Sequence, residues 1–252
     1  MKKFLVVISL LIVTVNLKAG DSVDSMIVSL KVDQQEALNQ GDMDKFTDIA
    51  NKLERLSTFG EKEWLIHYYL SYNYYRMSTI SEDEEASGKY IEQAKKWIEK
   101  SLEEKGDFAE SHILYSSVLG FEIGINPRLA MTNGVKSVRE VEKAQKLDDK
   151  NPRAYLVDGM MTLNRPSMFG GGADRALPKL NKAVELFNNE EDDMGIYPEW
   201  GEDEVYIWLG ITYEKKEDKS KALEYYRKAL EVNPENGWAK QMIARLEVEE
   251  EE

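Results

Sequence analysis

Residues 202–236 carry the most regular pattern of the chain and read EDEVYIWLGITYEKKEDKSKALEYYRKALEVNPEN. In the first half, Tyr206, Leu209, Gly210 and Tyr213 recur every three or four residues, a spacing that places them on one face of a helix. Because Gly210 has no side chain, a neighbouring helix can approach closely at this position. The first half therefore predicts a helix whose apolar face contacts a second helix.

The second half of this stretch predicts that second helix. After a polar turn at residues 215–221, Ala222, Tyr226 and Ala229 again lie three or four residues apart and alternate small and large side chains. Large side chains of one helix can then pack against small ones of the other. Pro234 cannot continue a helix, so it predicts where the second one ends.

This helix-turn-helix pattern resembles the tetratricopeptide repeat (TPR), a unit of about 34 residues, and nearly every signature position of that family is filled. Weaker copies of the pattern precede it, for example at Leu70, Ser71 and Tyr74. The resemblance covers residues 61–236. It implies an all-α fold, a right-handed superhelical solenoid of antiparallel helix pairs.

The chain is expected to form a single helical-repeat domain over residues 20–249, after a signal peptide at residues 1–19 and before an acidic tail at residues 249–252. Terminal repeats are usually atypical because one of their sides faces water. The expected units are an N-terminal helix pair at 23–58, repeats at about 61–104, 109–149, 152–187 and 202–236, and a capping helix at 237–248.

The start of the chain has the form of an export signal. Lys2 and Lys3 precede an apolar run at residues 4–15, and residues 17–19 (LKA) offer a small residue for cleavage. This run of 12 residues is shorter than the roughly 20 that a membrane-spanning helix needs. We therefore expect cleavage, with a membrane anchor as the alternative.

The chain contains no cysteine, which excludes lipid attachment at an N-terminal cysteine, disulfide bonds and thiolate chemistry. Together with the export signal, this predicts a soluble protein in the periplasm of a Gram-negative bacterium that is not a lipoprotein. It also predicts that no part of the chain spans the membrane after cleavage.

The net charge limits which classes of macromolecule this protein is expected to bind. The formal net charge is −14, and it becomes −17 when the signal leaves with its three lysines. Nucleic acids and anionic membrane surfaces are bound mainly through Lys and Arg, so this balance argues against both. A basic partner is permitted but not required.

Four segments interrupt the repeat pattern: 78–87, 124–134, 165–172 and 188–201. Loops of this kind often carry specificity. The acidic run at residues 82–85 invites a calcium-site interpretation, but it lacks the alternating Asp or Asn residues and the central Gly of a known calcium loop. A solvated loop is the preferred interpretation. The residues expected to contribute specificity are Phe169, Gly170, Gly171, Gly172 and Trp200.

The three consecutive glycines also suggest a phosphate-binding loop, but no Lys-Ser or Lys-Thr follows them and no strand precedes them. We expect them instead to adopt positive φ angles, which would let Phe169 fold back onto its helix pair. The combination P-x-x-F-G-G-G, A-L-P and P-x-W-G over residues 164–201 resembles a group of exported, uncharacterised repeat proteins of the Bacteroidota.

Candidate catalytic residues are scarce. His67 and His112 occupy the large-residue position that Tyr206 fills in the last repeat, which predicts packing between helices and leaves a shared metal site as the alternative. The chain has no G-x-S-x-G turn and no H-E-x-x-H motif. The sequence therefore predicts a protein that is not an enzyme, with no catalytic residue, no metal site and no cofactor.

The first helices of stacked pairs line the concave surface of a solenoid. The side chains that the signature leaves facing inward are mainly apolar and aromatic, with two arginines, and such a patch usually marks a partner or ligand site. The alternative is that the N-terminal helices or a tight superhelix fill the groove. The predicted groove residues are Tyr68, Tyr72, Arg76, Ile113, Ser117, Phe121, Arg153, Leu156, Met160, Asn164, Ile207 and Ile211.

The first functional hypothesis is an exported, non-catalytic scaffold whose concave groove binds a protein or peptide segment; a homo-oligomer is compatible with it. The second is a periplasmic accessory or carrier protein for a small apolar or anionic ligand. The layout resembles the repeat-containing T-component of tripartite ATP-independent periplasmic (TRAP) transporters. A closed cavity with Arg76 or Arg153 at its wall would favour the ligand, and an open groove would favour the peptide.

Overall fold

The computed structural model describes residues 22–190 and 195–251. The expected signal peptide at residues 1–19 lies outside them, and so do the side chains of the expected acidic tail. Three short 3₁₀ turns accompany the helices: η1 (Ser57–Phe59), η2 (Pro127–Leu129) and η3 (Ser167–Phe169). The α-helices are α1 (Val23–Gln40), α2 (Met43–Leu56), α3 (Glu63–Ile80), α4 (Glu84–Glu104), α5 (Ala109–Ile125), α6 (Ala130–Leu147), α7 (Pro152–Asn164), α8 (Ala173–Phe187), α9 (Glu202–Glu214), α10 (Lys219–Val232) and α11 (Gly237–Glu251).

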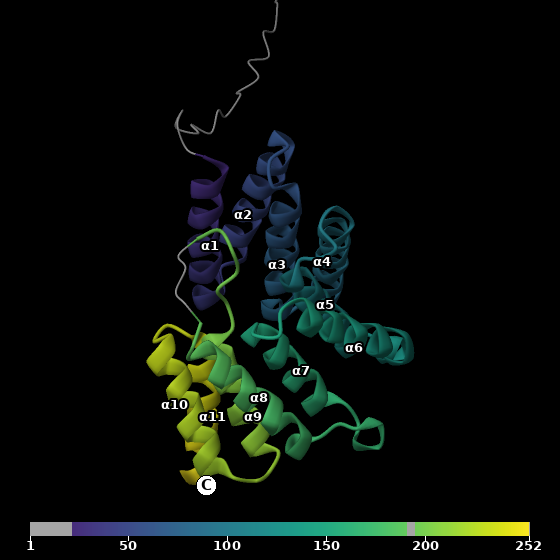
Figure 1. Cartoon of the computed structure of the whole chain (residues 1–252). Coiled ribbons are helices and arrows are strands. Elements are labelled where there is room, and N and C mark those ends of the chain that lie inside the picture. Colours follow the sequence, from purple (N-terminus) through teal and green to yellow (C-terminus); the bar gives the residue numbers. More distant parts are fainter. Residues whose placement is uncertain (1–21, 191–194, 252) are drawn as a thin grey trace, which may run out of the picture.

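Consecutive helices pack as pairs, α3 with α4, α5 with α6, α7 with α8 and α9 with α10 (Figure 1). No strand occurs in the described part of the chain, and the predicted all-α, TPR-like solenoid is confirmed. None of the described helices is long and apolar enough to cross a membrane.

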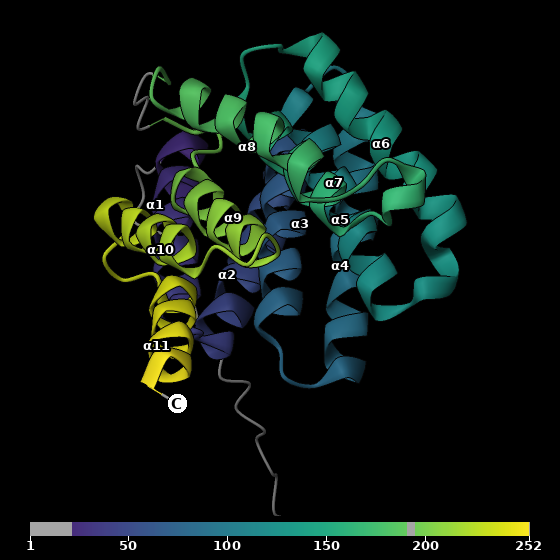
Figure 2. The same cartoon turned by 90° about the horizontal axis from the view of Figure 1, so that it is seen from below.

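The solenoid turns tightly enough to bring its two ends together. Viewed along the direction of Figure 2, α10 and α11 lie beside the N-terminal helices. The contact is direct, since the Asn233 side-chain amide, at the end of α10, donates a 3.1 Å hydrogen bond to Oδ1 of Asn39 in α1. The repeats therefore enclose their inner side instead of leaving it as an open trough.

Local sequence explains where helices begin. The carboxylate of Asp42 accepts a 2.9 Å hydrogen bond from the Lys45 amide at the start of α2. At the start of α10, the carboxylate of Asp218 accepts a 3.1 Å hydrogen bond from the Lys221 amide. Such caps satisfy main-chain amides that have no partner inside the helix. Asn151 caps α7, whose first residue is Pro152, a position where the missing amide hydrogen costs nothing.

Glycines mark two close helix contacts. A Cβ added at Gly210 would lie 2.3 Å from Cε1 of the buried Tyr226, and one added at Gly159 would lie 2.6 Å from Cδ2 of Leu180. Real Cβ atoms do not approach other atoms so closely. The small-against-large packing predicted from residues 202–236 is therefore the contact that joins α9 to α10.

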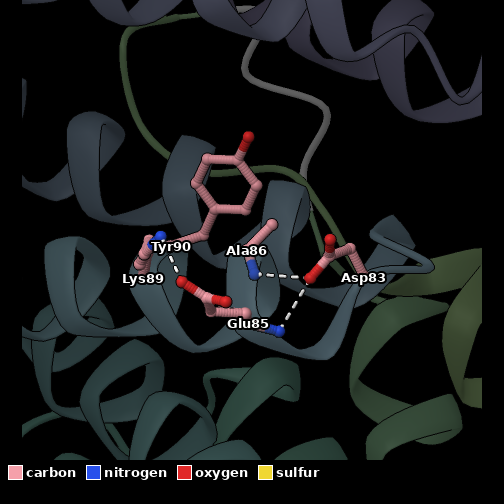
Figure 3. A pocket seen from close by; sticks show the side chains of 5 residues that line it. All are labelled: Asp83, Glu85, Ala86, Lys89 and Tyr90. Atoms are coloured by element: carbon pink, nitrogen blue, oxygen red, sulfur yellow. Dashed lines mark hydrogen bonds and ion pairs between the residues drawn. The ribbon is translucent and has the colours of Figure 1, made fainter.

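Two of the four predicted interruptions are largely helical, which corrects the sequence interpretation. Helix α3 continues to Ile80 and α4 begins at Glu84, so only residues 81–83 separate them. The carboxylate of Asp83 accepts hydrogen bonds from the amides of Glu85 at 2.8 Å and Ala86 at 3.0 Å (Figure 3). The acidic residues thus cap and charge a helix N-terminus, where negative side chains are favourable.

The second correction concerns residues 124–134, because α6 runs without a break through Gly134 after the short η2 turn. A glycine inside a helix costs only about 1 kcal/mol, which packing of the buried face outweighs. The segments that stay irregular are therefore 165–172 and 188–201.

Candidate functional site

The inner side of the solenoid is occupied by part of the chain itself. The described residues that lead into α9, 195–200, pass beside α1 (Figure 1) and lie against α1, α3 and α7. We call residues 195–200 the inner segment. Trp200 packs against three separate hydrophobic clusters, which makes it the central side chain of this region.

The main chain of the inner segment is held by side chains of the surrounding helices. In the described part of the chain, its carbonyl and amide groups make no hydrogen bond to other main-chain groups. Three side chains donate to its carbonyl oxygens: Lys31 Nζ to Gly195 at 2.6 Å, Tyr69 OH to Ile196 at 2.6 Å, and Arg153 Nη1 to Trp200 at 3.4 Å. The helices therefore hold the inner segment, which bends at residues 195–197, through its backbone.

The side chains of the inner segment occupy distinct surroundings. The indole of Trp200 donates from Nε1 to the Tyr68 hydroxyl at 2.8 Å, and its ring centroid lies 5.9 Å from that of Tyr72. Pro198 is buried. Glu199 is exposed, yet one of its carboxylate oxygens lies 3.0 Å from the ammonium of Lys31.

The remaining large side chain, Tyr197, is half exposed, and its ring centroid lies 6.2 Å from that of Phe108. Tyr197 therefore contacts both the protein and the solvent.

Arg76 lies next to the indole and is paired with Glu204 of α9. Both side chains are buried, and the guanidinium donates to both carboxylate oxygens, at 3.3 Å from Nη1 to Oε2 and also from Nη2 to Oε1. The Arg76 guanidinium also lies 4.8 Å from the Tyr72 ring centroid and 5.5 Å from that of Trp200. Burial opposes the charge of Arg76, but the Glu204 carboxylate outweighs it and raises the arginine pKa.

Arg153 forms the second buried charge cluster. Its Nε donates to Oε1 of Glu110 at 2.6 Å and its Nη1 to Oε2 of Glu190 at 3.2 Å. Burial lowers the arginine pKa, whereas Glu110 and Glu190 raise it by more, so the guanidinium stays charged. Oε2 of Glu110 is buried without a hydrogen-bond partner among the described residues. Both predicted groove arginines are thus neutralised by glutamates of the same chain.

The structure places part of the predicted groove set at the inner segment and covers most of the set. Tyr68, Tyr72, Arg76 and Arg153 contact Trp200, whereas Ile207 packs with α10 and α11 and Asn164 accepts a hydrogen bond from Lys215. Phe121, Met160 and Ile211 are partly buried, and Asn164 is exposed at the end of α7. That any of the predicted groove residues binds a partner stays a prediction. The buried members are Tyr68, Tyr72, Arg76, Ile113, Ser117, Arg153, Leu156 and Ile207.

Sequence reasoning missed the occupant of the groove. Tyr69, Lys31 and Glu204 contact the inner segment or Arg76, but none was among the predicted groove residues. The available signal was the pair of aromatic anchors, Tyr197 and Trp200, inside an otherwise acidic loop. Which surface such anchors meet depends on how the superhelix closes, and a single sequence does not contain that information.

The 165–172 segment forms a compact turn. Gly170 and Gly172 have φ angles of 84° and 112°, as expected for glycines. A Cβ on Gly171 would lie 1.8 Å from the Arg165 carbonyl oxygen, so this position also excludes a side chain. Phe169 does not fold back onto the helix pair as expected, because it stays 59% exposed at the tip of the turn, next to Met168 at 82%.

The two histidines lie in separate environments. His67 stacks on Trp97, with ring centroids 5.1 Å apart, and its Nδ1 lies 3.1 Å from Oε2 of Glu104. The Nδ1 of His112 lies 2.5 Å from Oε2 of Glu140. Each ring is therefore buried against its own glutamate, and no group of three or more metal-binding side chains occurs in the described residues.

Comparisons with known proteins bear on the repeat and on the fold. The sequence model of the tetratricopeptide repeat matches residues 204–236. No curated protein sequence matches the chain. Among solved structures, the chain is similar to the HusA haemophore from Porphyromonas gingivalis, with a TM-score of 0.64 and 24% identity over 75% of this chain and 92% of that chain.

A second solved structure is TTC0263, a thermophilic TPR protein of Thermus thermophilus, with a TM-score of 0.60 and 13% identity over 87% of this chain and 99% of that chain. At such identities the likeness concerns the fold alone. The chain therefore contains a tetratricopeptide repeat at residues 204–236 and has the all-helical solenoid fold of tetratricopeptide-repeat proteins.

Proposed function

We propose that this protein is an exported, non-catalytic scaffold whose inner side binds an extended segment of a partner protein. The observation that carries the proposal is the set of three hydrogen bonds from Lys31, Tyr69 and Arg153 to carbonyl oxygens of residues 195–200. Carbonyl groups are common to every peptide, so these donors can hold a main chain of any sequence. The helices already hold a non-helical stretch of their own chain in this way.

The aromatic surroundings support the same proposal. Tyr68 and Tyr72 face the indole of Trp200, and aromatic side chains in desolvated pockets commonly supply most of the affinity of an interface. A peptide can present an aromatic anchor to these tyrosines while its carbonyl oxygens accept hydrogen bonds from Lys31, Tyr69 and Arg153. The arrangement suits recognition of a chain better than chemistry on a small substrate.

Display of random peptides against the purified protein, followed by affinity measurements on the selected peptides, tests the proposal. Tyr72→Ala is expected to weaken their binding by about tenfold or more, because it removes a central aromatic face. The matched control is Tyr90→Ala in α4. Tyr90 lines a surface pocket near the start of that helix together with Asp83, Glu85, Ala86 and Lys89 (Figure 3), and the substitution is expected to leave the affinity unchanged. Equal affinities for both variants would exclude the inner side as the site.

Export to the periplasm is a further part of the proposal. It is supported by the signal-like sequence at residues 1–19, which lies outside the described residues. Cell fractionation combined with intact mass measurement of the recovered protein tests it. A mature chain that begins after Ala19 and is released with the periplasm is expected, whereas an uncleaved chain in the cytoplasmic fraction would contradict export.

A second candidate is a carrier for a small, flat, apolar and anionic ligand such as haem. One structurally similar protein is described as a haemophore, and the inner side combines tyrosine faces with Arg76 and Arg153. Those arginines are already paired with glutamates, and the enclosed inner side accommodates a stretch of main chain, so the peptide scaffold is the favoured candidate. A role like that of the TRAP accessory subunit belongs to this second class.

Titration of the purified protein with haemin, followed by visible absorbance, separates the two candidates. A carrier is expected to give a saturating spectral change that Tyr72→Ala weakens and Tyr90→Ala does not. A scaffold for peptides alone is expected to show no saturation with haemin while still binding the selected peptides.

A further inference from the structure

We infer that residues 195–200 are an intramolecular substitute for the partner, and that the partner presents a non-helical segment of the same chemistry, with an acidic residue followed by a tryptophan. The inference rests on the proposed function and specifies the chemical class of its ligand. It also implies that partner and inner segment compete for one site.

The first argument is the conformation of the inner segment. It lies in no helix or strand, and in the described part of the chain its main chain bonds only to side chains of other elements. Loop residues normally satisfy their backbone through turns or water. Residues 195–200 instead have the hydrogen-bonding pattern of a peptide bound by a receptor.

The second argument is the site for the indole. Trp200 donates from Nε1 to the hydroxyl of Tyr68, a tyrosine with no exposed surface, and the ring lies beside Tyr72 and the Arg76 guanidinium. A large ring with an N–H donor satisfies all of these contacts. Phenylalanine would fill the volume but leave the Tyr68 hydroxyl without its donor.

The third argument is charge. Lys31 has only 11% of its side chain exposed. Its ammonium donates a 2.6 Å hydrogen bond to the Gly195 carbonyl and forms a 3.0 Å ion pair with the Glu199 carboxylate. A largely buried cation in a chain of net charge −14 selects an acidic residue on the ligand and discriminates against a basic one. In the ligand, the acid directly precedes the indole residue, as Glu199 directly precedes Trp200.

Competition follows from the covalent connection. A tethered ligand acts at an effective concentration that reaches millimolar values for short linkers, so a free peptide of similar affinity is largely excluded. Weakening the contacts of the inner segment should therefore increase the affinity of the site for a peptide added in trans. This consequence separates a ligand substitute from a merely structural loop.

The experiment uses the full chain and a labelled peptide with the sequence GIYPEW, identical to residues 195–200, with blocked ends. Fluorescence anisotropy is expected to show at least about tenfold tighter binding to the Trp200→Ala variant than to the unmodified protein, because the indole site is then vacant. Trp238→Ala, which removes a partly exposed tryptophan of α11 instead, is the matched control and should bind like the unmodified protein. Circular dichroism checks that each variant is folded.

Two altered peptides test the chemistry. A peptide with alanine in place of tryptophan should lose most of its affinity for Trp200→Ala. A peptide with lysine in place of glutamate should also bind weakly, and a protein carrying both Trp200→Ala and Lys31→Glu should restore its binding by reversing the charge. If Trp200→Ala does not fold, Glu199→Lys takes its place, because Glu199 is exposed and a lysine there would repel Lys31 and weaken the hold on the inner segment.

The inference and the proposed function can fail separately. If GIYPEW binds Trp200→Ala no better than the altered peptides, the ligand class is wrong. Peptides selected by display that depend on Tyr72 would then still support the scaffold. If neither GIYPEW nor any displayed peptide binds, the proposed function fails as well.

Discussion

At the contact between Gly210 and Tyr226, a single missing side chain sets the distance between α9 and α10. Because an added Cβ would lie 2.3 Å from the Tyr226 ring, Gly210→Ala is expected to lower the free energy of unfolding by about 1–3 kcal/mol. This loss outweighs the higher helix propensity of alanine. Urea unfolding of the variant provides the measurement.

Gly134 in α6 is the matched control, because an added Cβ would have no atom within 4 Å. Gly134→Ala is expected to raise the free energy of unfolding by about 0.5–1 kcal/mol, since alanine is the better helix former. A stabilising effect of Gly210→Ala as well would show that α9 and α10 separate easily, contrary to their close packing.

The pair between Arg76 and Glu204 is expected to be costly to break. Glu204→Gln leaves the Arg76 charge buried without a counter-charge, which should reduce the free energy of unfolding by about 3–5 kcal/mol. Replacing both residues, as Arg76→Met with Glu204→Leu, should recover much of the loss because neither charge then remains. Thermal unfolding monitored by circular dichroism distinguishes these outcomes.

Glu224→Gln serves as control for that pair, since Glu224 and Lys228 form an exposed ion pair at 2.7 Å within α10. Exposed pairs contribute little to stability, so the melting temperature should barely move. Similar losses for Glu204→Gln and Glu224→Gln would mean that water reaches Arg76. Only the structure reveals the buried pair, because its members lie 128 positions apart in the sequence.

Among the elements, α3 carries the largest group of buried tyrosines. Burial raises the pKa of Tyr72 and of Tyr75 to about 12, against an ordinary value of about 10. Since the unfolded chain releases these protons more readily, the neutral tyrosines contribute stability that is complete below pH 10 and is lost as the pH rises through about 12. Each tyrosine accounts for about 3 kcal/mol of this loss.

Urea unfolding at a series of pH values between 9 and 12 is expected to show the decline, with phenolate absorbance following the ionisation. Tyr72→Phe should make the decline shallower, because one of the titrating groups is removed. A stability that stays constant to pH 12 would mean that these hydroxyls are as accessible as in the unfolded chain. The sequence shows that α3 is rich in tyrosine, but it does not show that both faces of this helix are buried.

At the element scale, helix caps depend on fewer residues than loops do. Asp42, directly after Gly41, caps α2 through the Lys45 amide. The acidic run after Ile80 was interpreted as a solvated loop, whereas Asp83 caps α4 and the following glutamates lie in its first turn. Composition alone does not distinguish the two, because acidic residues suit both a solvated loop and a helix N-terminus.

For the whole molecule, the contact between the two ends is expected to make unfolding more cooperative than in an open solenoid. Asp203 accepts hydrogen bonds from the side-chain amides of Asn233 at 2.8 Å and Asn236 at 2.7 Å, and Asn233 also reaches Asn39 of α1. Asp203→Ala should therefore loosen α1 as well as α11. Amide hydrogen exchange is expected to accelerate in both helices.

The control for this prediction is Asp174→Ala, which removes an exposed carboxylate paired with Lys216 and should leave exchange in α1 unchanged. In an open solenoid each repeat contacts only its neighbours, so a change at one end does not reach the other. Faster exchange in α10 and α11 alone would show that the ends are independent.

The sequence by itself determined the helical period and the repeat at residues 202–236, because both depend on side chains that recur every three or four residues within a helix. It also placed side chains such as Tyr68 and Tyr72 on the inner helices.

Only the tertiary structure decided that the inner side is filled, and by which residues. That outcome depends on the small rotation between successive helix pairs, which accumulates along the solenoid until α10 and α11 return to α1 and residues 195–200 are held between α1, α3 and α7. The Trp200 indole contacts Tyr68 and the Glu199 carboxylate contacts Lys31. Both partners lie more than a hundred positions away in the sequence, so no local pattern encodes these contacts.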